Sequence, residues 1–93
     1  MMIGNETETE LSRSEVVAII VAELEKKGPL PEGAELESFD FMASGQIDSL
    51  ALLGFITELE NKCELIFQDE DFNRAGFSTV GGLADIILDL RSK

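Results

Sequence analysis

The residue best suited to chemistry is Ser49, in the segment Gly45-Gln46-Ile47-Asp48-Ser49-Leu50. The apolar pattern that follows predicts a helix beginning at this serine. The first N–H groups of a helix have no partners within it and the helix dipole is positive there, so a phosphate ester on Ser49 would be stabilised by the backbone. On its own, an Asp-Ser pair before a helix usually indicates only a helix cap. The context of the pair therefore decides between a cap and a modified serine.

Histidine is absent from the chain, and this limits what Ser49 can do alone. Histidine is the usual general base near neutral pH and the commonest neutral metal ligand. A serine hydroxyl without an activating base is a poor nucleophile, so another protein must accept its proton. We therefore expect no catalytic residues and no metal site, and a protein that is not an enzyme by itself.

An acidic segment offers a second kind of chemistry, calcium binding. Asp69, Asp71 and Asn73 match the first three ligand positions of an EF-hand loop. The sixth position is Arg74, where a glycine makes the sharp turn, and the twelfth is Val80, where a bidentate glutamate is needed. We interpret the segment as acidic and solvated rather than as a calcium site.

The elements that position Ser49 begin with a helix near the N-terminus. Ser12 and Glu15 have the spacing of a capping box, and Leu11 and Val16 that of a hydrophobic staple. Lysines followed by a Gly-Pro pair predict an end near Lys27. The expected apolar face consists of Val17, Ile20, Val21 and Leu24.

A long loop and two further helices complete the expected fold. Residues 28–47 contain two prolines and three glycines without a helical period, so they predict a connecting loop. Its apolar anchors are expected to be Leu36, Phe39, Phe41 and Met42.

The second helix is expected over residues 49–62, with Asp48 as N-cap and an inner stripe of Leu53, Ile56 and Leu59 supported by Phe55. Residues 69–75 suit one or two helical turns, and Ser78 or Thr79 is expected to cap a last helix. The chain is therefore predicted to be all-α. We expect a small four-helix bundle of three longer helices and one short one, with the long loop between helices 1 and 2.

Length and composition constrain the rest. Ninety-three residues suit one domain, which we assign to 11–93, after a flexible N-terminal tail of alternating Glu and Thr at 1–10. The net charge of −12 disfavours nucleic acid and anionic lipid and favours basic partners, although acidity can also serve only solubility.

Compartment and membrane contact are predicted from the cysteine count and the apolar runs. A lone Cys63 and the lack of a secretory signal favour a cytoplasmic location. The longest apolar run, 16–22, is far below the roughly 20 residues of a membrane span. We expect a monomer without a membrane span.

From residue 12 to 91 the chain resembles the acyl carrier protein family. The resemblance rests on an ordered combination: Asp48-Ser49-Leu50 opening a helix, an apolar stripe ending in Leu59-Glu60, the acidic turn Asp69-Glu70-Asp71, and Ser78-Thr79-Val80 opening the last helix. It implies that Ser49 accepts 4′-phosphopantetheine from coenzyme A. A separate phosphopantetheinyl transferase would deliver the arm with the help of magnesium. The arm ends in a thiol that carries cargo as a thioester.

The same resemblance implies roles for the neighbours of Ser49. Asp48 would contact the transferase or its metal, and Leu50 would pack against visiting enzymes. The expected partner-binding residues are Leu50, Ala51, Gly54, Thr57 and Glu58.

The chain departs from the family at two places. In carriers of bulk fatty-acid synthesis the outer face of the second helix is acidic, whereas here Glu58 is the only charge among Ala51, Gly54, Thr57, Glu58 and Asn61. This change is either a surface suited to an apolar partner or cargo, or tolerated drift at an exposed site. Cys63 stands near a position where relatives often carry an aromatic residue, and we expect no redox role for it.

These departures favour a dedicated pathway. Its enzymes would be a ligase that loads acyl or aminoacyl cargo, and downstream transferases. The alternative is an acidic helical adaptor that binds a basic partner and leaves Ser49 unmodified.

Overall fold

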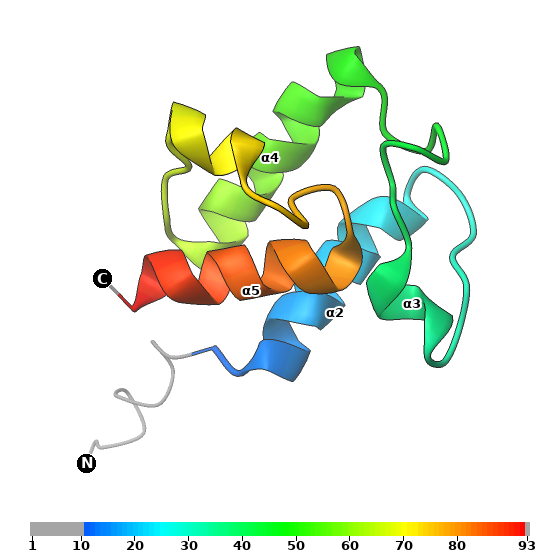
Figure 1. Ribbon diagram of the computed structural model, residues 1–93, viewed down its shortest axis with the longest axis horizontal. Coiled ribbons are helices and arrows are strands. Elements are labelled where there is room, and N and C mark those ends of the chain that lie inside the picture. The colour runs from blue at the N-terminus through cyan, green and yellow to red at the C-terminus, as the bar shows by residue number, and fades with distance from the viewer. Residues whose placement is uncertain (1–10, 93) are drawn as a thin grey trace.

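The computed structural model describes residues 11–92. The elements follow one another as α2 (Arg13–Glu25), α3 (Glu35–Ser38), α4 (Ser49–Cys63), the 3₁₀ helix η1 (Asp69–Asn73) and α5 (Val80–Arg91) (Figure 1). Within this range there is no strand, and the one β-type contact is an isolated bridge between Asp40 and Thr79. The all-α expectation is confirmed for these residues. The tail expected at 1–10 lies outside them.

Helix α2 begins where the sequence predicts, because side chains cap its first turn. The Glu15 N–H donates to Ser12 Oγ at 3.2 Å, and the Ser12 N–H donates to Glu15 Oε1 at 2.8 Å, which completes the predicted capping box. The helix ends at Glu25, two residues before the expected end near Lys27. Its buried apolar face is Val16, Ile20 and Leu24, while Val17 and Val21 are only half-buried.

The three long helices share one core. Helix α2 packs against both α5 and α4, and α3 packs against α5. The residues that fill this core without exposed surface are Val16, Ile20, Leu24, Phe41, Ile47, Leu59, Cys63, Val80, Leu83, Ala84 and Ile87. Burying large apolar side chains stabilises the fold by roughly 1.5–3 kcal/mol each.

The expected loop contains a helix that the sequence pattern did not predict. Helix α3 has only four residues, and it is held from the side by Arg13 of α2. The Arg13 guanidinium bonds Glu37 at 2.7 Å and Asp85 of α5 at 2.9 Å. Among the expected anchors, Phe41 is fully buried, and its ring meets that of Phe55 at 5.1 Å in an edge-on arrangement.

The acidic segment forms a 3₁₀ helix instead of the short α-helix expected at 69–75. Asp71 Oδ2 accepts the Gln68 N–H at 2.8 Å, which closes a tight first turn. The rings of Phe67, Phe72 and Phe77 pack against one another and hold both ends of the segment. The 3₁₀ helix η1 spans five residues, as is usual for this kind of helix, which is seldom long.

The glycine pair at the start of α5 serves close packing. Thr79 is the N-cap, since its Oγ1 accepts the Gly82 N–H at 3.0 Å. A Cβ added at Gly82 would overlap the carbonyl oxygen of Gly76 and lie 2.6 Å from its Cα, and one at Gly81 would lie 2.8 Å from Glu37 Oε1. The two glycines weaken a helical turn but allow the preceding turn and α3 to approach.

An unexpected buried charge joins α2 to α4. Glu23 is only 4% exposed, and its Oε2 lies 2.6 Å from Lys62 Nζ of α4 and 3.2 Å from Lys26 Nζ. The hydrogen bond from Lys62 is the main cause that lowers the pKa of Glu23, against the opposing effect of burial. The carboxylate is therefore held in its charged form between two cations.

Replacing this carboxylate should make stability depend less on pH. A group whose pKa is lowered by folding stabilises the fold above its unfolded pKa, about 4.3 for glutamate, and loses that contribution as the pH falls through the folded value. We predict that Glu23→Gln costs about 1–3 kcal/mol of unfolding free energy at pH 7. The cost should shrink steadily below a pH of about 4.3, as measured by urea denaturation.

Glu25→Gln is the matched control, because Glu25 is an exposed carboxylate on the same helix. It should cost less than about 0.5 kcal/mol at either pH. Equal losses for both variants, or a Glu23→Gln loss that does not change with pH, would contradict the assigned role.

Candidate functional site

Ser49 is the first residue of α4, and its side chain is exposed. Asp48 precedes it in an extended conformation, and Asp48 Oδ1 accepts the Ala51 N–H at 2.8 Å. The predicted N-cap is therefore confirmed. No hydrogen bond of the Ser49 hydroxyl is made to any residue between 11 and 92. The N-terminal turn of α4 stands at the top edge of the molecule in Figure 1.

The chain in front of Ser49 is fixed by Asp40. Its Oδ1 accepts the N–H groups of Met42 and Ala43 at 3.0 and 2.8 Å, and its Oδ2 accepts the Ser78 hydroxyl at 3.0 Å. The bond from Ala43 is the main cause that lowers the pKa of Asp40. Aspartate often closes a turn in this way, so the sequence held a signal for Asp40 that our prediction missed.

Two further contacts set the direction from which the chain enters α4. The Phe41 N–H donates to the Ser78 carbonyl at 2.9 Å, and the Ile47 N–H donates to the Phe41 carbonyl at 3.0 Å. From the other side, Gln46 Nε2 donates to the carbonyls of Leu24 and Gly28 at 3.1 and 3.0 Å. Gln46 thereby ties the residues before Ser49 to the end of α2. No local pattern could have predicted this contact.

The backbone at this point suits an anion. Asp48 satisfies the Ala51 N–H, which leaves the other N–H groups of the first turn without a partner within the helix. These groups and the positive end of the α4 dipole favour a phosphate ester. The residues present therefore fit a phosphopantetheine attached through the Ser49 oxygen.

The outer side of α4 is apolar at its start. Leu50 is 88% exposed and Leu53 is 73% exposed. Gly54 is exposed, Ala51 is half-buried, and the four residues together are termed here the α4 apolar face. The expectation that Leu53 belongs to the inner stripe is wrong. Helix α4 is rotated so that its buried residues are Phe55, Ile56, Leu59 and Cys63.

Thr57 and Glu58, the other two expected partner residues, are also exposed, one turn further along α4. The Thr57 hydroxyl donates to the Leu53 carbonyl at 2.9 Å. The structure thus places all five expected partner residues along one helix, with only Ala51 half-buried.

Two hollows flank the start of α4. The α2–α4 groove, of about 350 Å³, is lined by Glu23, Lys26, Lys27, Leu50, Ala51, Gly54, Phe55 and Glu58. On the other flank a hollow of about 310 Å³ is lined by Met42, Leu52, Phe72, Arg74, Gly76, Phe77 and Ser78. Leu50 and Ala51 line the first hollow and Leu52 lines the second, so space that a ligand or partner could enter lies beside the first turn of α4.

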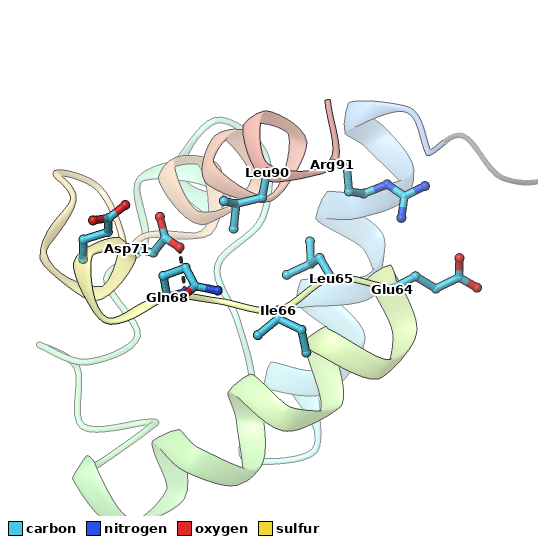
Figure 2. A pocket seen from close by; sticks show the side chains of 8 residues that line it. Glu64, Leu65, Ile66, Gln68, Asp71, Leu90 and Arg91 are labelled. Atoms are coloured by element: carbon cyan, nitrogen blue, oxygen red, sulfur yellow. Dashed lines mark hydrogen bonds between the residues drawn. The ribbon is translucent and has the colours of Figure 1, made fainter. Parts of the chain in front are cut away.

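A larger hollow, of about 510 Å³, lies at the opposite end of α4. Figure 2 shows Glu64, Leu65 and Ile66, which follow α4 directly, together with Leu90 and Arg91 from the end of α5. Helix α4 has 15 residues, so this hollow is about 20 Å from Ser49 along the helix axis. Because of this distance, we do not assign the hollow to the site around Ser49.

Other candidate groups are engaged in packing. Cys63 is buried, and burial is the main cause that raises the pKa of its thiol, so the reactive thiolate is disfavoured. Asp71 of the acidic segment is buried, bonds Gln68 and lies 3.5 Å from Arg74. Across residues 11–92, no cluster of three or more acidic or cysteine side chains is arranged to hold a metal ion. No helix in that range combines the length and apolar character needed to cross a bilayer.

The cap geometry predicts what changes at position 48 will do to stability. Asp48→Ala removes the acceptor for the Ala51 N–H and should cost about 1 kcal/mol of unfolding free energy. Asp48→Ser retains a capping oxygen and should cost no more than a few tenths of a kcal/mol. Chemical denaturation measures both. Equal losses for alanine and serine would mean that the carboxylate acts through something other than the cap.

Comparison of the chain with protein-family models, with curated proteins and with solved structures finds no match.

Proposed function

We propose that this protein is a carrier of the acyl carrier protein type, which holds acyl or aminoacyl cargo as a thioester on a 4′-phosphopantetheine arm attached to Ser49. The observation that carries the proposal is the exposed Ser49 hydroxyl at the first position of α4, beside a capping Asp48. The fold proposed with it is the four-helix carrier bundle, in which η1 takes the place of the short helix.

For attachment of the arm, this chain needs only to hold the Ser49 hydroxyl in place and to leave it accessible to the transferase. Ser49 Oγ would form the new bond to phosphorus of coenzyme A, its proton would pass to the transferase, and adenosine 3′,5′-bisphosphate would leave. The N–H groups of the first turn and the dipole of α4 would then stabilise the phosphodiester. The group supplies a terminal thiol that carries the cargo as a thioester.

The surroundings of Ser49 favour a substrate role rather than a catalytic one. The chain has no histidine, and Asp48 Oδ1 already accepts the Ala51 N–H. The proton acceptor would therefore belong to the transferase. Asp48 Oδ2 accepts no hydrogen bond from residues 11–92, so the same carboxylate can cap α4 and contact the transferase or its magnesium ion.

The partners of such a carrier are enzymes that act in turn. They comprise the phosphopantetheinyl transferase, a ligase that loads the cargo, and downstream transferases. A tethered cargo reaches each active site at high effective concentration, so each contact with the carrier can be brief. The α4 apolar face, Thr57 and Glu58 lie beside the attachment point and are the proposed contact residues.

The direct test is transfer of the arm in vitro. The purified protein is incubated with coenzyme A, magnesium and a broad-specificity phosphopantetheinyl transferase, and the intact mass is recorded. The wild type should gain one phosphopantetheine, and Ser49→Ala should gain none. Circular dichroism should show that both proteins are folded.

Ser14→Ala is the matched control, because Ser14 is an exposed serine in the first turn of α2. It should load as the wild type does. An unchanged wild-type mass would favour the unmodified adaptor, and loading of Ser49→Ala would place the arm on a different residue.

A further inference from the structure

The hollow of about 510 Å³ at the end of α4, termed here the end hollow, has an apolar centre. Ile66 is 66% exposed, and the half-buried Leu65 and Leu90 line the hollow with it. The next residue along the chain, Phe67, is buried, so the segment between α4 and η1 is packed while Ile66 faces the solvent. Apolar side chains that meet in an open hollow are typical of a surface that a partner covers.

The charges in the lining of the end hollow are predominantly negative. Three carboxylates, those of Glu64, Glu70 and Asp71, stand against one guanidinium, that of Arg91. The Arg91 guanidinium donates a hydrogen bond to the Cys63 carbonyl, so it is already engaged within the protein. The excess of negative charge in the hollow therefore has the same sign as the net charge of −12 of the whole chain.

Two of the three carboxylates are available to a partner. Asp71 is buried and accepts the Gln68 N–H at 2.8 Å. Glu64 and Glu70 are exposed, and neither side chain makes an ion pair or a hydrogen bond among residues 11–92. In Figure 2 the apolar centre lies between Glu64 on one side and Asp71, the sequence neighbour of Glu70, on the other. The available carboxylates therefore border the apolar centre on two sides.

Glu64 occupies a position at which the fold itself favours glycine. It ends α4 with a φ of 58° and a ψ of 54°, in the left-handed region. Among residues 11–92 it is the only residue other than glycine with a positive φ. A side chain crowds the backbone in this conformation, and glycine is the usual residue at such a helix end. Positions of this kind are often functional, which supports a role for the carboxylate outside folding.

Local and long-range charge select the same kind of partner. The field of the whole chain speeds the encounter with basic surfaces and slows the encounter with acidic ones. At short range, a lysine or arginine side chain entering the end hollow would meet Glu64 or Glu70, whereas a carboxylate would be repelled by both. The apolar centre then calls for an apolar side chain between the basic ones.

We propose that the end hollow docks a basic segment of a partner protein, which sets an apolar side chain against Ile66 and lysine or arginine side chains against Glu64 and Glu70. The hollow lies about 20 Å from Ser49 along the axis of α4. A partner bound there holds the protein at one end and leaves the serine end free for the enzymes of the proposed function. The docking surface itself does not depend on modification of Ser49.

The test uses two synthetic peptides, one with a leucine flanked by lysines and one in which serine replaces that leucine. All their other residues are uncharged and polar. Each peptide is titrated into the full-length ¹⁵N-labelled protein at physiological salt, and amide shifts give the location and the affinity of binding. The leucine peptide should shift the amides of Glu64, Ile66 and Glu70 in a saturable way. It should bind about fivefold more tightly than the serine peptide, because its leucine is covered by Ile66, and Ile66→Ser should remove that difference.

Charge substitutions separate contact in the hollow from the field of the whole chain. Glu64→Gln and Glu70→Gln should each weaken binding of the leucine peptide by about twofold to fivefold, the range of a surface ion pair. Glu25→Gln and Glu32→Gln are the matched controls, because these exposed carboxylates do not line the hollow. Each control should change the affinity by less than about 1.5-fold, because salt screens distant charges.

Glu64→Gly separates docking from folding. Glycine should raise the urea midpoint of unfolding, because it adopts the left-handed conformation without crowding the backbone. The same variant should weaken binding of the leucine peptide as much as Glu64→Gln does. Circular dichroism checks that every variant is folded.

Four results would overturn the inference: shifts at the start of α4 instead of the end hollow, equal affinities of the two peptides, equal effects of Glu64→Gln and Glu25→Gln, or undiminished binding to Glu64→Gly. Loading of Ser49, measured by mass, should proceed at the same rate with the leucine peptide bound, and a block of loading would also overturn it. Absence of loading without any peptide removes the carrier role and leaves the docking surface to be judged by the amide shifts.

Discussion

The proposed role depends on how the backbone enters α4. The residues before Ser49 are held from two sides: Phe41 is bonded to the Ser78 carbonyl, and Gln46 to the carbonyls that end α2. Asp48 then caps the helix and directs the Ser49 side chain outward. If either side were loose, the first turn would fray and the serine would lose its fixed place at the positive end of the helix dipole. A modest set of hydrogen bonds thus positions an otherwise unremarkable hydroxyl.

The acidic side chains of the protein lie apart from the uncharged surface beside Ser49. All 19 acidic side chains lie outside the first two turns of α4, because residues 49–57 carry no charge. The buried Glu23 pairs with Lys62 and Lys26 where α2 meets α4, and Glu23 and Lys26 also line the neighbouring groove together with Lys27 and Glu58. Packing of the two helices and the character of the neighbouring groove therefore have a common cause.

Features set by neighbouring residues were predictable from the sequence. The capping box of Ser12 and Glu15, the caps at Asp48 and Thr79 and the all-α class follow from spacing and side-chain chemistry alone. Features that depend on contacts between residues distant in the sequence were not predictable from it. The exposure of Leu53 depends on how α4 is rotated against α2. The burial of Glu23 depends on Lys62, which lies 39 positions away in the sequence. The position of α3 depends on its contact with Gly81. Of the site itself, Asp48 and Ser49 were predicted, whereas the support from Asp40 and Gln46 needed the tertiary structure.

We propose that Ser49 carries the arm in the cell, and peptide mass spectrometry on the protein isolated from the cells that make it can detect the arm there. The proteolytic peptide that contains Asp48-Ser49-Leu50 is fragmented to locate any added group. We expect phosphopantetheine, free or bearing cargo, on Ser49. A peptide that is unmodified in every preparation, under conditions in which phosphopantetheine on other proteins of the same cells is detected, would contradict it.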